Sequence, residues 1–219
     1  MRDMKRGLKT EDSFQKTMEK LIKFVVQHRD IAIWIGIGII AAIFVIGYLL
    51  YPQEKTNPEA ELIYTQAINF VSMGRLQDAE NYFLQLTEKY NNTRPGKVAY
   101  YYLGVINYHT ARFSEALDYF DKFISKEKKD PLLIPSAQFG AGCAAEGLKD
   151  YERALKYYEK VAKNKDSNFY FLGMLSWGRI NGILGNTDKA REILQKLLQQ
   201  NPPQDITNDA KFYLGYFNR

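Results

Sequence analysis

The residues that could do chemistry are few and scattered. The two histidines, His28 and His109, have no cysteine or carboxylate at a spacing that binds a metal. The one cysteine, Cys143, lies among small residues in the run AGCAAEG, which favours close helix packing over nucleophilic catalysis. No phosphate loop, Ser/His/Asp set or flanked carboxylate pair stands out. We predict that the protein is not an enzyme and has no catalytic residues, no metal and no cofactor.

An apolar run, Ile31 to Tyr51, determines where the rest of the chain lies. It contains no Asp, Glu, Lys, Arg or His. As a helix it is about 31 Å long at about 1.5 Å per residue, close to the roughly 30 Å hydrocarbon core of a bilayer. The run ends in Leu49-Leu50-Tyr51-Pro52, without the small-x-small site of a cleaved signal. We predict a retained transmembrane helix over 31–51.

Basic residues near this run predict its orientation. Four of them lie on the N-terminal side and one on the other: Lys16, Lys20, Lys23 and Arg29, against Lys55. The positive side usually stays in the cytoplasm, so the remaining residues are expected outside it. In a bacterium with two membranes, this predicts a single-pass inner-membrane protein with a periplasmic domain.

The positive charge is concentrated before the span. Residues 1–30 hold eight Lys or Arg and five Asp or Glu, a net +3, which leaves +2 of the total +5 for residues 31–219. A nearly neutral outer domain argues against nucleic acid as a partner. The basic excess instead favours contact with anionic membrane lipid.

The tail, residues 1–30, has apolar residues at helical spacing between Thr10 and Gln27. They are Phe14, Met18, Leu21, Ile22 and Val25. This pattern predicts a cytoplasmic amphipathic helix, either on the membrane surface or docked on a membrane complex. After the span, residues 52–57 form a polar tether, and Asn57-Pro58-Glu59 is typical of a helix start.

From Pro58 onward the sequence repeats. An alanine followed by large apolar residues four and seven positions later occurs four times. The alanines are Ala79, Ala116, Ala154 and Ala190, separated by 37, 38 and 36 residues. A turn position lies five residues before each, at Gly74, Ala111, Lys149 and Gly185. Further upstream a small marker residue recurs at Ala67, Gly104, Gly142, Gly178 and Gly215.

Because the repeat alanine and the marker residue recur with the same period, they predict a stack of helical hairpins, with small residues where helices cross closely. The expected fold class is all-α: the N-terminal helices, then an α-solenoid of about four hairpins with a C-terminal capping helix. The repeat domain spans 58–219. Its expected units are 58–94, 95–131, 132–168 and 169–203, with a cap at 207–219.

These repeats resemble tetratricopeptide (TPR) repeats. The clearest match is AYYYLGVINYHTARFSEALDYFDKFI, residues 99–124, followed by the run that begins Tyr151-Glu152-Arg153-Ala154. The period departs from the usual 34 residues, and the Trp expected early in the first helix is absent. The architecture resembles the YfgM-like ancillary subunits of the SecYEG translocon, inner-membrane proteins whose periplasmic repeats are thought to pass translocated chains to chaperones.

We expect the first helix of each unit to line a concave face, with positions three before and one after each marker residue pointing into it. These positions are Tyr64, Ile68, Tyr101, Val105, Phe139, Cys143, Leu175, Arg179, Phe212 and Tyr216, to which Tyr108 is added. An aromatic and aliphatic groove with one Arg suits an apolar or extended segment of another protein. The alternative is that superhelical curvature buries these side chains. Leu103, Phe113, Phe120, Tyr158 and Trp177 are expected in the core.

The preferred hypothesis is a membrane-anchored TPR adaptor. Its expected partners are translocon subunits, periplasmic chaperones or unfolded clients. An alternative is a self-associating envelope scaffold for cell-wall or outer-membrane assembly, a homodimer held in part by the pairs Ala32 with Gly36 and Gly38 with Ala42. A third reading inverts the topology and places the repeats in the cytosol of a eukaryote, as in mitochondrial import receptors.

Overall fold

The computed structural model describes residues 16, 18–19, 23, 26–50 and 57–218. The predicted amphipathic helix between Thr10 and Gln27 and the tether 52–57 lie largely outside these residues. The chain divides into two compact units, Met1–Gln53 and Glu54–Arg219. In the first unit, helix α2 spans Arg29–Leu50 and leaves its apolar side chains exposed, among them Ile33, Trp34 and Phe44. It is long and apolar enough to cross a membrane.

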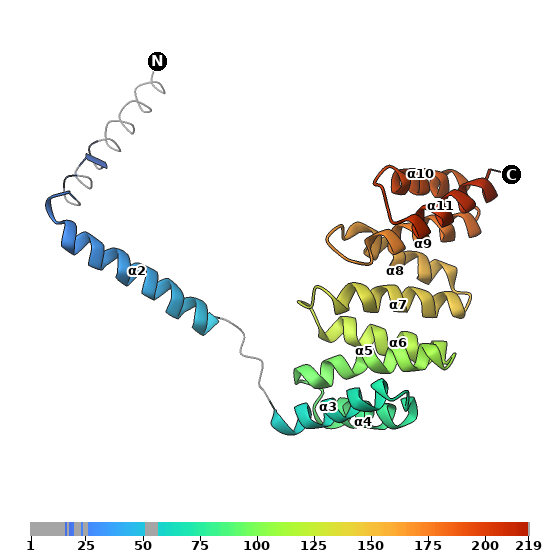
Figure 1. Ribbon diagram of the computed structural model, residues 1–219, viewed down its shortest axis with the longest axis horizontal. Coiled ribbons are helices and arrows are strands. Elements are labelled where there is room, and N and C mark those ends of the chain that lie inside the picture. Colours follow the sequence, from blue (N-terminus) through green and yellow to red (C-terminus); the bar gives the residue numbers. More distant parts are fainter. Residues whose placement is uncertain (1–15, 17, 20–22, 24–25, 51–56, 219) are drawn as a thin grey trace, which may run out of the picture. The chain divides into compact units, whose positions relative to one another are not determined.

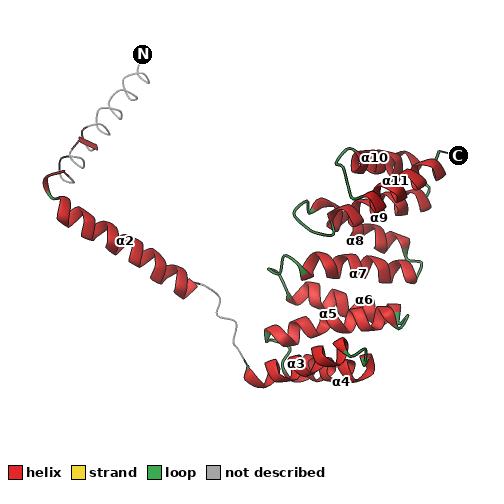
Figure 2. Ribbon diagram, viewed as in Figure 1, coloured by secondary structure: helices red, strands yellow, loops and turns green. Residues whose placement is uncertain are grey.

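The second unit is an α-solenoid, and the predicted all-α fold class is confirmed (Figure 1). Its helices are α3 (Pro58–Ser72), α4 (Leu76–Lys89), α5 (Arg94–His109), α6 (Phe113–Lys126), α7 (Leu133–Gly147), α8 (Tyr151–Lys163), α9 (Tyr170–Ile183), α10 (Thr187–Leu198) and α11 (Gln204–Tyr216). The first eight form four antiparallel hairpins, and α11 closes the stack (Figure 2). Helix α11 begins at Gln204, directly after Pro202-Pro203 and ahead of the expected cap at 207.

Local sequence explains where these helices begin and turn. The side chain of Asn57 caps α3 by accepting hydrogen bonds from the backbone N–H groups of Glu59 and Ala60, both at 3.1 Å. The turn inside each hairpin has one residue in the left-handed region, at the position that the repeat predicted. The φ values are 72° at Gly74, 58° at Ala111, 59° at Lys149 and 83° at Gly185. One turn geometry therefore recurs in all four hairpins.

The core lies where the repeating small and large residues meet. All four alanines of the repeat are fully buried. A methyl group at Gly104 would lie 2.7 Å from the ring of Phe120, and one at Gly142 would lie 2.6 Å from the ring of Tyr158. Gly178 meets Leu194 in the same way, at 2.8 Å. Each of these first helices can thus lie close to its own second helix only because the marker residue lacks a side chain.

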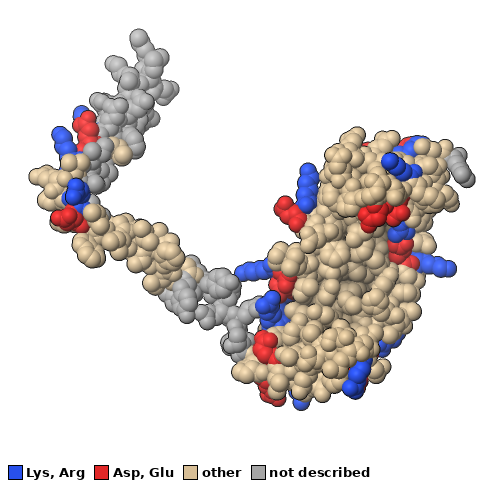
Figure 3. Space-filling model, in the orientation of Figure 1, with Lys and Arg blue, Asp and Glu red and all other residues tan. Residues whose placement is uncertain are grey.

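The first helices of successive units also pack on one another at α3–α5, α5–α7 and α9–α11, whereas α7 and α9 approach less closely. The ring of Phe169, at the end of the α8–α9 loop, packs on Phe139 of α7 with 5.7 Å between centroids. Charged side chains lie mainly around the edge of the face shown in Figure 3, and its middle is uncharged. The wider spacing at α7–α9 leaves room for a pocket.

Candidate functional site: a pocket across three first helices

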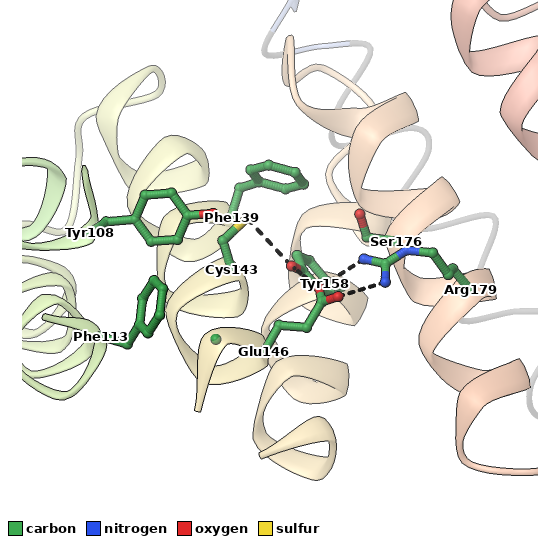
Figure 4. A pocket seen from close by; sticks show the side chains of 9 residues that line it. Tyr108, Phe113, Phe139, Cys143, Glu146, Tyr158, Ser176 and Arg179 are labelled. Carbon is green, nitrogen blue, oxygen red and sulfur yellow. Dashed lines mark hydrogen bonds and ion pairs between the residues drawn. The ribbon is translucent and has the colours of Figure 1, made fainter. Parts of the chain in front are cut away.

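The pocket has a volume of about 400 Å³ and is lined by residues of α5, α7 and α9, with contributions from α6 and α8. Its lining residues are Tyr108, Phe113, Phe139, Cys143, Glu146, Gly147, Tyr158, Ser176 and Arg179 (Figure 4). The volume is within the range of sites that hold a small ligand or a few side chains. Three hairpins must stack in register to form it.

An ion pair between α7 and α9 forms one wall. Arg179 donates two hydrogen bonds to Glu146, from Nη1 to Oε1 at 2.6 Å and from Nη2 to Oε2 at 2.7 Å. The hydroxyl of Tyr158 donates to Oε2 of the same carboxylate at 2.8 Å. These three bonds from two other helices fix Glu146. The pair therefore connects the third and fourth hairpins where α7 and α9 are farther apart.

The electrostatics keep this wall in one charge state. Burial alone would raise the pKa of Glu146, but the hydrogen bonds and positive charge of Arg179 outweigh burial and lower that pKa. The hydrogen bond to Glu146 raises the pKa of Arg179. Both groups are consequently charged at neutral pH, and each is neutralised by the other. The remaining N–H groups of Arg179 can still donate to a ligand.

The opposite wall is apolar and aromatic. Phe139 packs on Tyr158 with 5.4 Å between ring centroids, and Tyr108 packs on Phe113 with 5.6 Å. Burial raises the pKa of the Cys143 thiol, whose Sγ lies 3.4 Å from the Tyr158 hydroxyl oxygen. A protonated thiol is a weak nucleophile. With its carboxylate held by Arg179 and its thiol protonated, the pocket offers a ligand an aromatic wall and hydrogen-bond donors.

The structure brings together four of the residues expected in the groove: Tyr108, Phe139, Cys143 and Arg179 all line the pocket. Tyr64 lines a second cavity of about 210 Å³ with Glu61, Arg94 and neighbouring apolar residues. Tyr101 lies between helices instead, where its hydroxyl hydrogen-bonds to Ser136 of α7 at 2.8 Å.

The remaining groove residues differ in exposure. Ile68 and Val105 are half-buried, and Leu175 is only 7% exposed among the core residues of the fourth hairpin. Phe212 and Tyr216 of α11 are 65% and 62% exposed. The groove as a whole stays a prediction.

Sequence reasoning missed several lining residues. Glu146, Gly147 and Ser176 had no predicted role, and Phe113 and Tyr158 were expected only in the core. A signal for Glu146 does exist, because it lies four residues after the marker Gly142, as Tyr108 lies four after Gly104. Applying that offset to every unit would have added Glu146 to the residues expected in the groove.

Comparisons with known proteins agree with this architecture. Residues 33–212 match the family model described as T7SS, ESX-1 secretion system protein EccA1, N-terminal domain. No curated protein sequence matches the chain.

Several solved structures are similar. A MamA RS-1 double mutant shares 17% identity over 74% of this chain and 84% of its own, with a TM-score of 0.62. YrrB, described as a TPR protein with an unusual peptide-binding site, shares 18% identity over 70% of this chain and 75% of its own, with a TM-score of 0.57. MamA 41-end from Desulfovibrio magneticus RS-1 shares 18% over 67% and 77%, with a TM-score of 0.56. The chain therefore has a TPR-like solenoid fold.

Proposed function

Because the chain belongs to the family of the N-terminal domain of the ESX-1 secretion system protein EccA1, we propose that it is an interaction protein whose pocket binds an extended segment of another protein. The observation that carries this proposal is the 400 Å³ pocket with an aromatic wall facing a neutralised ion pair. An apolar side chain of a bound segment fits among Phe139, Phe113 and Tyr108. The hydroxyls of Tyr108 and Ser176 can hydrogen-bond to its backbone.

Support for a protein ligand also comes from the rest of the first-helix face. Of the predicted groove residues outside the pocket, Ile68 and Val105 occupy the same repeat offset as Cys143, in the first and second hairpins. Tyr64 lines the second cavity. An extended segment that lies along successive first helices would contact one such position per unit. YrrB, of similar fold, has a peptide-binding site according to its description.

We place the protein at a membrane, with α2 as its anchor. The length and apolar composition of α2 support this placement, because they match the thickness of the hydrocarbon core of a bilayer. The basic flank supports a cytoplasmic N-terminus and an extracytoplasmic solenoid. If α2 is an anchor, the protein should stay in the membrane on alkaline extraction. If the solenoid is extracytoplasmic, external protease should cleave it in spheroplasts. A freely soluble protein would refute the anchor.

The partners proposed are translocon subunits, periplasmic chaperones or unfolded clients. Two likenesses support this class. The architecture resembles that of the YfgM-like translocon subunits, and the matched family is named after a secretion system protein. A solenoid anchored next to the membrane would meet such chains as they emerge.

Site-specific photocrosslinking in cells tests this function. A benzoylphenylalanine placed at Phe139, in the pocket, is compared with one at Leu62, which is 59% exposed on α3 and outside the pocket. We expect secretory chains, chaperones or translocon subunits to crosslink to position 139 and not to position 62. Equal capture at both positions, or none at 139, would refute binding at the pocket.

Self-association through the span is a second candidate. A methyl group added at Gly36 or Gly38 would meet no heavy atom within 4 Å among the residues that the structure describes, so a second helix could approach α2 closely there. The double substitution Gly36→Leu and Gly38→Leu should abolish dimers in a membrane association assay. A wild-type monomer in mild detergent would exclude this candidate.

A further inference from the structure

Helix α11 is the first helix of a fifth unit. It carries the marker Gly215 with Phe212 three residues before and Tyr216 one residue after, the same offsets as in the other first helices. Its other side packs on α9 and α10, where Phe217 lies over Gly182 and Ile206 and Ala210 are buried. Among the residues that the structure describes, no second helix follows it.

In the complete units, the second helix of the same hairpin packs against the marker residue and the residue three before it. Phe120 of α6 lies against Gly104, and its ring centroid is 6.1 Å from that of Tyr101, three residues before the marker. Phe123 lies 5.7 Å from the same ring. The large residues four and seven positions after the repeat alanine therefore enclose the residue three positions before the marker.

On α11 none of the described residues fills the corresponding space. A methyl group at Gly215 would meet no heavy atom within 4 Å. Phe212 is 65% exposed, whereas Leu175, the corresponding residue of α9, is 7% exposed. The rings of Phe212 and Tyr216 stack one turn apart, with centroids 6.5 Å apart and an interplanar angle of 21°. This face is apolar and has a glycine at its centre, like the faces that second helices cover in the other units, but no described helix lies over it.

We propose that this face of α11, formed by Phe212, Gly215 and Tyr216, binds an amphipathic helix of a partner protein. In the second, third and fourth hairpins the second helix covers the marker glycine in the same way, so the occupant should follow the rule of those second helices. It has a small residue at one position and large apolar residues four and seven positions later, and it runs antiparallel to α11.

One charge distinguishes the expected occupant from α6. In the second hairpin, Nζ of Lys126, ten residues after Ala116, lies 5.7 Å from the ring of Tyr100, four residues before the marker. The residue at that offset in α11 is Lys211, which is exposed. A lysine in the occupant would meet a like charge there, so the occupant should carry a carboxylate at this position.

A helical peptide tests the proposal directly. The probe has the sequence of residues 113–126 with Glu in place of Lys126. A lactam between the side chains of Asp118 and Lys122 keeps it helical, since these residues already form an exposed ion pair at 2.6 Å. Anisotropy of the labelled peptide is measured with the full chain in lipid nanodiscs. A scrambled peptide with the same lactam is the control.

We expect saturable binding that weakens at least tenfold in the double variant Phe212→Ser with Tyr216→Ser, and also in Gly215→Leu, which fills the space over the glycine. Leu62→Ser, an equally exposed apolar site on α3, should bind as the wild type does. Lys211→Glu should reverse the preference, so that the peptide with Lys126 binds more tightly than the one with Glu.

No binding by the wild type, equal binding by the α11 variants or equal binding of the scrambled peptide would each overturn the proposal. So would a wild-type dimer that the double variant of Phe212 and Tyr216 abolishes, because a second copy would then be the occupant. Circular dichroism of each variant checks that the fold is retained, which is expected because the substituted positions are exposed. The pocket between α7 and α9 is not involved, so crosslinking at Phe139 is a separate test.

Discussion

Replacing Glu146 with Gln is the most informative perturbation of the pocket wall. The substitution keeps the shape of the side chain but removes the charge that neutralises Arg179. Three hydrogen bonds reach this carboxylate, two of them from a guanidinium. Breaking a fully buried ion pair costs about 3–5 kcal/mol, and a hydrogen bond to a charged group contributes about 1.5–3 kcal/mol.

The pair is not fully buried, because the side chains of Arg179 and Glu146 are 19% and 24% exposed. Water can therefore replace part of the lost interaction, and we expect a loss of about 2 kcal/mol in the free energy of unfolding. Arg179→Met should cost a similar amount. The double variant should be less destabilised than the sum of the two by about 1 kcal/mol, because it leaves no unpaired charge.

Urea unfolding in a Trp34→Phe background measures this change. Trp177 is then the only tryptophan, and it lies on α9, two residues before Arg179. Its fluorescence reports on the fourth hairpin, which the ion pair connects to the third. A loss below about 0.5 kcal/mol for Glu146→Gln, or additive effects in the double variant, would refute the claim that this pair holds α7 and α9 together.

Three further predictions concern pH, turns and glycines. Because the pKa of Glu146 is lowered by folding, its contribution is complete above its unfolded value of about 4.3 and is lost as pH falls through the lower folded pKa. Glu146→Gln should therefore reduce the acid sensitivity of unfolding. Lys149→Gly should stabilise by about 0.5–1 kcal/mol and Gly185→Ala should destabilise by about 1 kcal/mol in thermal unfolding, since both positions have positive φ. Gly104→Ala should cost about 1–3 kcal/mol in urea, because its methyl group meets Phe120, whereas Gly215→Ala, in open space, should cost nothing. Opposite signs in any of these comparisons would contradict the packing described.

The repeat made most of the solenoid predictable from sequence. The repeat alanines and the marker glycines Gly104, Gly142 and Gly178 lie at helix crossings, and such crossings require small residues regardless of distant contacts. The turn positions were equally clear although two of them are Ala111 and Lys149. These residues adopt a left-handed conformation that favours glycine, so composition alone would not have located them.

The pocket was less predictable because it depends on how successive units are spaced. Glu146 and Arg179 are 33 residues apart, and nothing local to either residue indicates that they pair. The wider approach of α7 and α9 has no signature in the repeat offsets. Phe139 and Leu175 occupy the same repeat offset, yet Phe139 lines the pocket and Leu175 is buried. The next first helix, α11, packs on α9, whereas α9 does not pack closely on α7.

Protection of Cys143 from alkylation tests the central claim, that the pocket binds extended protein segments. Cys143 is the one cysteine of the chain and lines the pocket, so the unmodified full chain can be used. Its rate of reaction with a maleimide is measured with and without saturating reduced, carboxymethylated α-lactalbumin, a permanently unfolded protein. A cysteine at Leu62 in a Cys143→Ala background is the control. The account predicts at least tenfold slower alkylation of Cys143 and no change at position 62; an unchanged rate at Cys143 would contradict it.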